Sequence, residues 1–339
     1  MAKLKYYALC SNNIAATKRH ATRIPHDDLT IVLNSTNWEF VEQAEAWCQA
    51  EGIDYHVTES DGTPATGKNS VFDLFLASDN DYMVLVDGDD FITPHGLVVY
   101  DMIAQSVSPP DAIALTQQFG LIPNDGRVRS MYFHGGFGEG SSRLFAADRD
   151  NPDHVHGAAV RPFYNSSDWW ASAIAGTSVE HWDEFTKDLS DAHQKLYTYA
   201  YNHLNGQESH LRVTFYSKAG AAFRFNPELV VGEDTLHYYQ LKNAWVAGDI
   251  DLKHLDELYP SYVYDQRVMG VVKWQNEQND GRGFLEWMTR LNTELDIMSA
   301  AGQMHTTQPA NVELTFADDY RPDVLGMVSY PARTQKPII

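Results

Sequence analysis

Apolar and amphipathic segments alternate along the first part of the chain. Compact runs rich in apolar residues have the length of strands, and they lie at 5–10, 29–33, 53–58 and 82–86. Segments in which apolar residues recur at intervals of three and four predict helices over 38–50, 68–76 and 96–103. Strands that alternate with helices predict an α/β fold, with a mostly parallel sheet flanked by helices on both faces.

The pattern becomes less regular in the second part of the chain. Its predicted elements are strands at 111–115 and within 211–225, a loop at 117–127, helical segments at 168–205 and 281–301, and a proline-rich tail at 303–339. We expect one domain over 1–245, made of halves at 1–110 and 111–245 with an irregular insertion at about 130–205. A helical extension and an extended tail would then occupy 246–339.

The stretch DYMVLVDGDD, residues 81–90, joins a predicted buried strand to a group of carboxylates. Asp87 and Asp89 follow the carboxyl end of that strand, where open α/β sheets place their ligands. Gly88 allows a tight turn and the close approach of a ligand. Carboxylates so close repel one another unless a cation lies between them, and oxygen ligands suit Mg²⁺ or Mn²⁺. Asp-Gly-Asp is also a common turn composition, but the apolar strand before it and the predicted helix after Pro94 favour a ligand site.

A second acidic pair opens a predicted helix further along the chain. Glu233 and Asp234 lie between Gly232 and Thr235 in the sequence GEDT. Acids at a helix start also have a structural explanation, because they accept from free N–H groups and oppose the helix dipole. Both explanations stay open for this pair on its own.

The segment GTPATGKN, residues 62–69, approaches the P-loop pattern, because it follows a predicted strand and opens a helix. Asn69 stands where that pattern requires a serine or threonine, so the motif is one residue short. A P-loop-like NTPase or kinase, with Lys68 on phosphates and Asp87 on Mg²⁺, is therefore an alternative function. A non-catalytic nucleotide-sugar-binding module is a further one, because a fold does not imply an activity.

Composition limits the partners. The 339 residues can bury a substantial core, and the formal net charge of -21 repels phosphate backbones at long range. Cys10 and Cys48 are too few for a disulfide framework and are expected to be buried thiols in a reducing compartment. Because no stretch approaches the roughly 18 apolar residues of a membrane helix or the layout of a signal peptide, we expect a cytoplasmic protein with no membrane partner.

In their order and spacing, these motifs resemble those of the GT-A glycosyltransferases. The likeness is strongest to the large inverting family of cellulose- and chitin-type synthases and bacterial polysaccharide transferases, and it covers roughly residues 5–245. It rests on a polar turn at 11–13, the GKN helix start at 67–69, the Asp-x-Asp motif at 87–89 and the GEDT helix start at 232–235. In overall character the chain also resembles glycosyltransferase-like proteins of large tailed phages, for which the location would be the cytoplasm of the host.

The resemblance implies transfer of a sugar from a nucleoside diphosphate sugar to an acceptor hydroxyl, with inversion. Asp89 would ligate Mn²⁺ or Mg²⁺, and Asp87 would lie near the ribose or hold the metal through water. Asp234 would be the general base, while Glu233 would orient the acceptor or tune that base. The residues implied for the donor site are Ser11, Asn13, Ser60, Asp61, Lys68 and Asp87.

The sequence alone leaves two parts of the site open, namely the histidine ligand of the metal and the identity of the nucleotide. Members of such families often use a later histidine as a metal ligand, and His237, His254 and His305 are all candidates; we take His237 into the predicted metal site. The nucleotide loop offers Glu59-Ser60-Asp61-Gly62 in place of the usual Asp-Asp-Gly-Ser run, so the nucleotide stays open.

The acceptor is open as well. A hydroxymethylated base of phage DNA, a glycan, a lipid-linked sugar and a protein all carry a suitable hydroxyl. A flipped or groove-exposed DNA base would need a local basic strip despite the net charge. The arginines that either form such a strip or are scattered surface charges are Arg127, Arg129, Arg143, Arg149 and Arg161.

Overall fold

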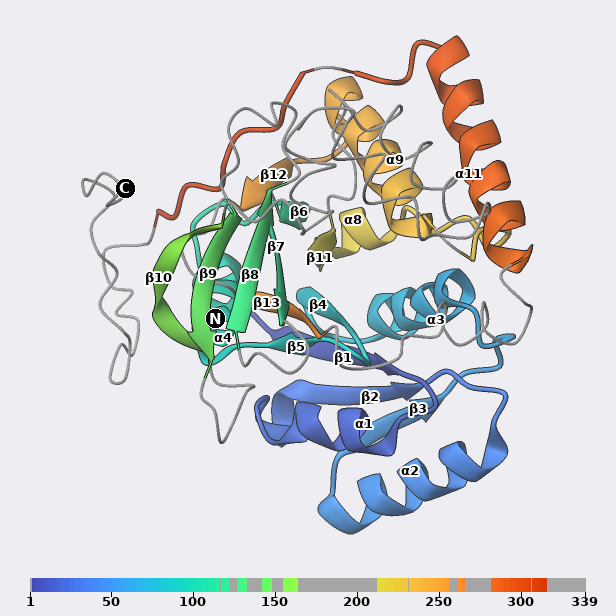
Figure 1. Ribbon diagram of the computed structural model, residues 1–339, viewed down its shortest axis with the longest axis vertical. Coiled ribbons are helices and arrows are strands. Elements are labelled where there is room, and N and C mark those ends of the chain that lie inside the picture. Colours follow the sequence, from blue (N-terminus) through green and yellow to red (C-terminus); the bar gives the residue numbers. More distant parts are fainter. Residues whose placement is uncertain are drawn as a thin grey trace.

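The structure is a computed structural model of the chain, shown in Figure 1. It describes residues 2–115, 117–121, 127–132, 142–147, 155–163, 212–230, 232–255, 261–265, 282–305 and 307–315. In these residues the chain forms two sheets with helices packed around the first. The fold class expected from the sequence, α/β with a mostly parallel sheet, is confirmed.

The first sheet has seven strands in the order β12-β6-β11-β4-β1-β2-β3. They are β1 (Leu4–Cys10), β2 (Leu29–Leu33), β3 (Asp54–Val57), β4 (Tyr82–Asp87), β6 (Ala112–Leu115), β11 (Val213–Ser217) and β12 (Leu252–Leu255). β11 is antiparallel to both of its neighbours, whereas the other pairs in this sheet are parallel. The carboxyl ends of β1, β2, β3 and β4 therefore meet at one edge, which is where the candidate site lies.

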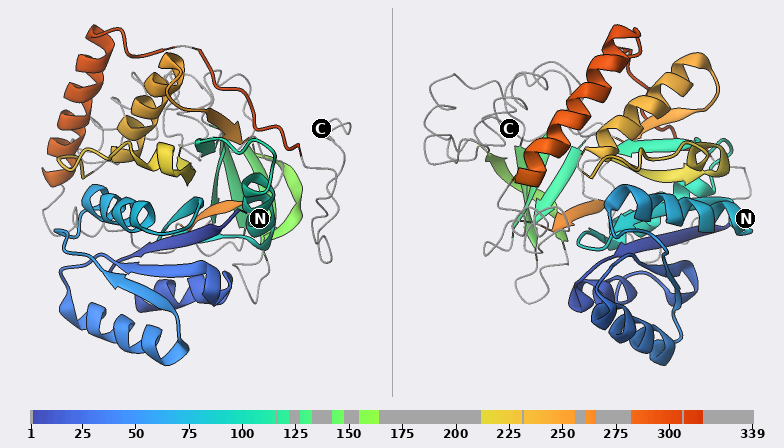
Figure 2. Two further views of the ribbon diagram at one scale, coloured as in Figure 1. Left: turned by 180° about the vertical axis from the view of Figure 1, so that it is seen from behind. Right: turned by 90° about the vertical axis from the view of Figure 1, so that its right-hand side faces the viewer.

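Helices cover both faces of this sheet (Figures 1 and 2). One face carries α1 (Ile14–Ala21), α2 (Trp38–Glu51) and α4 (Pro94–Ala104), with the short 3-10 helix η1 (His26–Asp28) between α1 and β2. The opposite face carries α3 (Pro64–Ala77), α8 (Lys218–Ala221), α9 (Glu233–Ala247) and α11 (Arg282–Ala300).

The core divides in the same way because successive residues of a strand point to opposite faces. In β1, Tyr7 and Leu9 belong to the cluster formed with α3 and α9, while Tyr6 and Ala8 belong to the cluster formed with α2 and α4. Both sets are buried, so β1 lies between two apolar layers. This explains why its sequence is a continuous apolar run rather than an alternating one.

The second sheet has six strands in the order β10-β9-β8-β7-β13-β5. They are β5 (Phe91–Ile92), β7 (Gln117–Leu121), β8 (Arg127–Tyr132), β9 (Ser142–Ala147), β10 (Val155–Phe163) and β13 (Tyr262–Asp265). β5 follows the acidic turn directly, so this sheet begins beside the candidate site. The expectation of a loop over 117–127 was wrong for 117–121, which pair with both β8 and β13.

Most local predictions from the sequence are confirmed. Gly52 ends α2 in the left-handed conformation, with a φ of 67°, and Asn37 caps its start. Trp38, which the apolar spacing assigned to the packing face, is 67% exposed, and Phe40 is buried instead. Helix α1 was not predicted, and α3 begins at Pro64 rather than at residue 68. The helical segment expected at 168–205 lies outside the described residues.

The C-terminal part of the chain contributes to the same body. β12 and β13 lie beyond residue 245, where the sequence suggested that an extension begins, yet each is a strand of one of the two sheets. The backbone of His254 in β12 pairs with Ala310 and Val312, and α11 packs against α9 through Leu291. Among the helices of the described part, none is both long enough and apolar enough to span a membrane.

Candidate active site

The acidic turn follows β4 and lies against the end of β1. Asp87 is the last residue of β4, and the N–H of Gly88 donates to the carbonyl of Leu9 over 2.7 Å. A Cβ at Gly88 would lie 2.5 Å from that carbonyl oxygen and 2.6 Å from Cα of Cys10. Glycine is therefore required here by contact with β1, in addition to any approach of a ligand.

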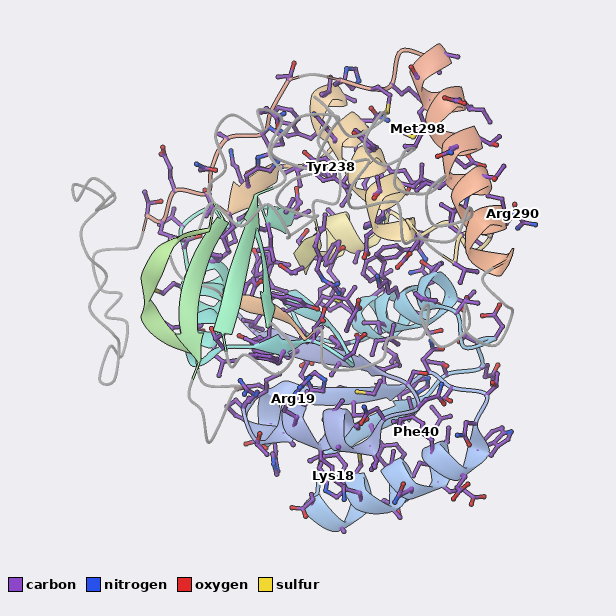
Figure 3. All side chains as sticks on the ribbon, viewed as in Figure 1. Lys18, Arg19, Phe40, Tyr238, Arg290 and Met298 are labelled. Carbon is purple, nitrogen blue, oxygen red and sulfur yellow. The ribbon has the colours of Figure 1, made fainter. Side chains whose placement is uncertain are left out.

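Side chains of helix α1 contact the backbone carbonyls of the acidic turn. Arg19, labelled in Figure 3, donates to the carbonyls of Asp89 and Asp90 over 2.9 and 3.1 Å. His20 lies 3.2 Å from the carbonyl of Gly88, and its burial lowers its pKa to about 3, so its ring is neutral at physiological pH. These contacts fix the direction in which the carboxylates leave the turn.

Asp87, Asp89 and Asp90 form a candidate cation site. One carboxylate oxygen from each lies within 4.8 Å of the others, the sole such group of metal-ligand side chains in the described residues. Oδ1 of Asp87 is buried and has no hydrogen-bond partner, so it lacks the compensation that a buried polar atom needs. Burial, with Asp87 beside it, raises the pKa of Asp89 to about 6. Three carboxylates with an orphaned oxygen fit a hard divalent cation such as Mg²⁺ or Mn²⁺.

Arg212, just before β11, is a buried cation on one side of the turn. It binds Oδ2 of Asp87 over 2.7 Å and lies 3.4 Å from Oδ2 of Asp90, with its guanidinium over the ring of Tyr262. The Tyr262 hydroxyl donates to Oδ2 of Asp90 over 2.7 Å and accepts from the backbone N–H of Asp87. Despite the cost of burial, these negative neighbours raise the pKa of Arg212 well above its usual value, so it stays charged.

Lys68 of α3 is a second buried cation, and it lies near the same Asp87 oxygen, Oδ2, that Arg212 binds. Its Nζ donates to Oε1 of Glu233 over 2.8 Å and to Oδ1 of Asp234 over 2.6 Å, and lies 3.8 Å from Oδ2 of Asp87. Burial works against its charge, but the carboxylates raise its pKa above the usual value. The two acidic motifs, separated by more than 140 positions in the chain, therefore meet at one ammonium group.

Helix α9 presents the second acidic pair at its first turn. Gly232 precedes the helix with a φ of 76°, a conformation that favours glycine, and a Cβ there would lie 2.2 Å from a methyl group of Leu291. Glu233 is buried, and burial raises its pKa to about 7. Burial also opposes the charge of Asp234, but Lys68 and Arg212 lower its pKa below the usual value. Neighbouring carboxyl groups with separated pKa values can serve different roles in proton transfer.

The loop residues expected to bind the nucleotide lie at the same sheet edge, and Asn13, Ser60 and Asp61 already have partners. Asn13 caps α1 by accepting from the N–H of Ala16 over 3.0 Å. Ser60 bonds the buried side chain of Asn34, and Asp61 accepts from residues of the loop that starts α3. The hydroxyl oxygen of Ser11 is buried without a partner. Hydrogen bonds of their own side chains thus organise the loops that follow β1 and β3.

The candidate histidines lie away from the carboxylate group. His237 stacks on Phe225 with ring centroids 4.0 Å apart, and it is not a member of the Asp87, Asp89 and Asp90 group. Burial lowers its pKa to about 3. His254 lies in β12 and bonds the hydroxyl of Tyr238 over 3.1 Å. The candidate cation site therefore groups Asp90 with Asp87 and Asp89, and His237 as a metal ligand stays a prediction from the sequence.

The P-loop alternative does not fit the local structure. Thr63 and Pro64 already form the cap and first turn of α3, so residues 64–68 are helical rather than a loop that cradles phosphate. Asn69, in place of the metal-binding hydroxyl, exchanges two hydrogen bonds of 2.9 Å with the backbone of Phe225. The segment that approaches the motif is a helix start that ties α3 to the chain before α9.

Sequence reasoning missed Arg212 and Tyr262 and gave Asp90 no role. Arg212 directly precedes a strongly apolar strand, and a charge in that position is the one signal that could have drawn attention to it. Tyr262 lies in a four-residue strand of the second sheet, and its meeting with Asp90 depends on pairing between β13 and β5. Contacts of this kind follow from topology and cannot be derived from local pattern.

Comparisons with known proteins show distant structural likeness only. No protein-family model matches the chain, and no curated protein sequence matches it. Among solved structures, S. aureus TarS 1-349 aligns with a TM-score of 0.40 and 14% identity over 78% of this chain and 60% of that one. Its complex with UDP-GlcNAc gives 0.39 and 13% over 78% and 59%. A mannose-1-phosphate geranyltransferase from Thermus thermophilus gives 0.26 and 10% over 60% and 66%.

The chain spans 37% of the length of the longer S. aureus TarS chain, with a TM-score of 0.37 and 12% identity. Likeness at this level does not bear on activity. What the site can do follows from its own side chains.

Proposed function

We propose that the protein is a metal-dependent glycosyltransferase that moves a sugar from a nucleoside diphosphate sugar to an acceptor hydroxyl. The observation that carries the proposal is the meeting of two acidic groups at the carboxyl end of the sheet. Asp87, Asp89 and Asp90 offer oxygen ligands with an orphaned buried oxygen on Asp87, and Asp234 stands across Lys68 from them. This pairs a cation site with a nearby ionised carboxylate, the two parts that such a transfer needs.

In this proposal Asp87 and Asp89, with Asp90 added by the structure, hold Mg²⁺ or Mn²⁺. When bound, the cation offsets charge on the departing diphosphate. Asp234 accepts the proton of the attacking hydroxyl, and its side chain is 31% exposed, so an acceptor can reach it. Because a single displacement reverses the configuration of the anomeric carbon, the transfer inverts. Buried Glu233 shapes the charge around that base.

The nucleoside would bind across the carboxyl ends of β1 and β3. Ser11 and Asn13 follow β1, and Ser60 and Asp61 follow β3, so all four lie on loops at the edge that Asp87 shares. Hydrogen bonds within these loops organise them before a ligand arrives, which lowers the entropy cost of binding. Lys68 is the exception among the predicted donor contacts, because it is buried among carboxylates.

The acceptor is proposed to be a hydroxymethylated base of phage DNA, with a glycan or a protein as the competing classes. Of the arginines that could favour DNA, Arg127 and Arg129 lie in β8, Arg143 in β9 and Arg161 in β10, while Arg149 lies outside the described residues. Strand pairing places Arg129 and Arg161 each opposite Leu144. Three neighbouring strands of one sheet therefore carry positive charge in a chain of net charge -21.

The test is a thermal-shift series with UDP, GDP, TDP, their sugar nucleotides and ATP, each with Mn²⁺, with Mg²⁺ or with chelator. Binding to the native state raises the melting temperature by mass action. We expect a metal-dependent shift with one nucleoside diphosphate and its sugars, lost in Asp89→Asn and kept in Asp234→Asn. Arg224→Met, which removes an exposed pair with Asp73, is the control that should keep the shift.

Donor turnover separates the two acidic residues. Asp234→Asn should bind the donor but release its nucleoside diphosphate at least about 100-fold more slowly than wild type, as expected for loss of a general base. Near-normal turnover in Asp234→Asn would contradict its role as base. A shift with ATP and Mg²⁺ alone, or none with any nucleotide, would contradict the proposal as a whole.

A further inference from the structure

Lys68 is the middle residue of the GKN segment, 67–69, whose three residues contact separate parts of the site. Gly67 packs so closely on Asn34 that a Cβ would lie 2.3 Å from its side-chain nitrogen. Asn69 exchanges two hydrogen bonds with the backbone of Phe225. Between them, Lys68 reaches the start of α9. The GKN segment thus fixes one end of α3 to β2 and to the chain that leads into the second acidic motif.

The Lys68 ammonium is enclosed by the protein itself. Its side chain is 1% exposed, it lies over the ring of Phe225, and two of its donors are used by Glu233 and Asp234 at short range. A phosphate could contact this ammonium only by displacing a carboxylate from a buried ion pair. Loss of one partner of such a pair leaves the other buried without its counter-charge, so this exchange is unfavourable.

On the basis of the proposed function, we infer that Lys68 is a positioning residue for Asp234 and not a ligand of the donor. It binds one oxygen of Asp234, Oδ1, and thereby sets the direction of the carboxylate on α9. The Asp234 side chain is partly exposed, so Lys68 can bind one oxygen of the carboxylate while the rest of it stays accessible to an acceptor. Lys68 acts on the reaction through that carboxylate.

The surrounding charges support this assignment. Groups from four elements affect Asp234: Lys68 from α3, Arg212 before β11, Asp87 at the end of β4 through Lys68, and Glu233 and His237 within α9. His237 is neutral because burial lowers its pKa, so Lys68 and Arg212 are the cations that oppose the cost of burying Asp234. Within the described part of the chain, Lys68 is the one of these two cations that forms an ion pair with the Asp234 carboxylate.

The test measures release of nucleoside diphosphate from the sugar nucleotide selected by the thermal-shift series, with Mn²⁺ and water as the acceptor. In this reaction the water oxygen bonds to the anomeric carbon, the bond from that carbon to the diphosphate breaks, and the water proton passes to Asp234. Lys68→Met should lower kcat about 100-fold, leave KM and the metal-dependent shift unchanged, and move the acid limb of the pH profile upward. Lys68→Arg, which returns the charge but not the compact ammonium, should restore kcat only in part.

Two comparisons separate a positioning role of Lys68 from a general loss of structure in Lys68→Met. Lys218→Met is the matched control, because Lys218 also lies over an aromatic ring, Phe75, but contacts only neutral oxygens, and its kcat should match wild type. In an Asp234→Asn background, Lys68→Met should cause no further loss of kcat, since its effect passes through Asp234. This double variant also removes the unpaired charge on Asp234, so it offers a second chance to obtain folded protein.

A rise in KM of tenfold or more with unchanged kcat in Lys68→Met would show that Lys68 binds the donor, and would overturn the inference while leaving the proposed function intact. Additive losses in the double variant would also overturn it. If wild-type protein shows no metal-dependent nucleotide binding, the proposed function fails first and the inference falls with it.

Discussion

Two buried cations flank Asp87, and the parts of the molecule that they hold are different. Arg212 joins Asp87 to Asp90, whose side chain is 1% exposed, and to the ring of Tyr262. Lys68 joins Asp87 to Glu233 and to the partly exposed Asp234. The Arg212 side is the more closed one, because Asp90 is buried and Asp87 is 23% exposed, whereas Asp234 on the Lys68 side is 31% exposed.

The choice of cation fits this difference. The guanidinium of Arg212 is planar, so it can serve two carboxylates at once while stacking on an aromatic ring. The ammonium of Lys68 is a compact charge with rotatable donors, which suits three carboxylates arranged around one point. In the proposed function the Arg212 side would fix the acidic turn and the Lys68 side would orient the proposed base, Asp234, so substitutions should separate the two sides.

The largest effect is expected from Arg212→Met. It removes the buried cation that pairs with Asp87 and Asp90, so we expect the free energy of unfolding to fall by about 3–5 kcal/mol, as for broken buried ion pairs. Lys68→Met should cost less, because Asp234 can regain water on its exposed side. Denaturant unfolding of both variants at one pH checks the order.

Two matched variants sharpen this prediction. Arg224→Met removes an arginine whose partner, Asp73, is exposed, so it should change stability by about 1 kcal/mol or less. Arg212→Met combined with Asp90→Asn should recover part of the loss, because it also removes a buried carboxyl group that has lost the Arg212 cation. A larger loss in Lys68→Met than in Arg212→Met would contradict the assignment of the closed side to Arg212.

The part of this comparison that sequence could supply is local. Buried strands, the helix bounded by Asn37 and Gly52, and the places of Asp87, Asp89 and Asp234 follow from apolar pattern, caps and acidic motifs within short windows. These features depend on a residue and its near neighbours, so one sequence is enough to indicate them.

The partners of those acids could not be predicted in the same way. Arg212 reaches Asp87 because β11 inserts antiparallel beside β4, and Tyr262 reaches Asp90 because β13 pairs with β5. Both pairings join segments that are far apart in the chain. Lys68 was noticed, but for a phosphate motif, because the pattern contains no sign of the carboxylates from α9 that enclose it.

Gly232→Ala tests the backbone at the start of α9, the helix that carries the two carboxylates bound by Lys68. A left-handed φ costs a residue with a Cβ about 1–2 kcal/mol, and contact with Leu291 adds about 1–3 kcal/mol of overpacking. We expect a stability loss of about 2–5 kcal/mol by these two causes, with a lower kcat because Glu233 and Asp234 follow directly. Gly248→Ala is the control: its φ is 84° but no atom lies within 4 Å of the new Cβ, so it should show the backbone cost alone. Equal losses in the two variants would contradict the contact with α11.

Tyr262→Phe tests the Arg212 side with a smaller change. It removes a hydroxyl that donates to Asp90 and accepts from the N–H of Asp87, while the ring under Arg212 remains. The hydroxyl serves two partners, so we expect a loss of about 1–3 kcal/mol in denaturant unfolding, for two hydrogen bonds of about 0.5–1.5 kcal/mol each. Tyr216→Phe, which removes a hydroxyl bonded to a backbone carbonyl, should cost only about 1 kcal/mol. A loss no larger than that of Tyr216→Phe would mean that one of the two bonds of Tyr262 contributes nothing to stability.

His237→Phe is the mildest probe, and it acts on the Lys68 side through pH. The ring of His237 stacks on Phe225, and burial lowers its pKa to about 3 from an ordinary value of 6.5. Asp234 favours its charged form and Lys68 disfavours it, but both act less than burial. Above pH 6.5 neither the folded nor the unfolded chain protonates this histidine, so it adds no pH dependence there.

Below pH 6.5 the unfolded chain binds a proton at His237 that the folded chain does not, so stability falls as the pH falls toward 3. The slope from this one group approaches about 1.4 kcal/mol per pH unit. His237→Phe keeps an aromatic ring on Phe225 and should remove that slope, which unfolding free energies measured between pH 7 and pH 4.5 would show as a flatter curve. His56→Phe, at an exposed position in β3, should leave the curve unchanged. If His237→Phe follows the wild-type curve, the ring is protonated in the folded protein, and a third cation then lies beside Asp234 in acid.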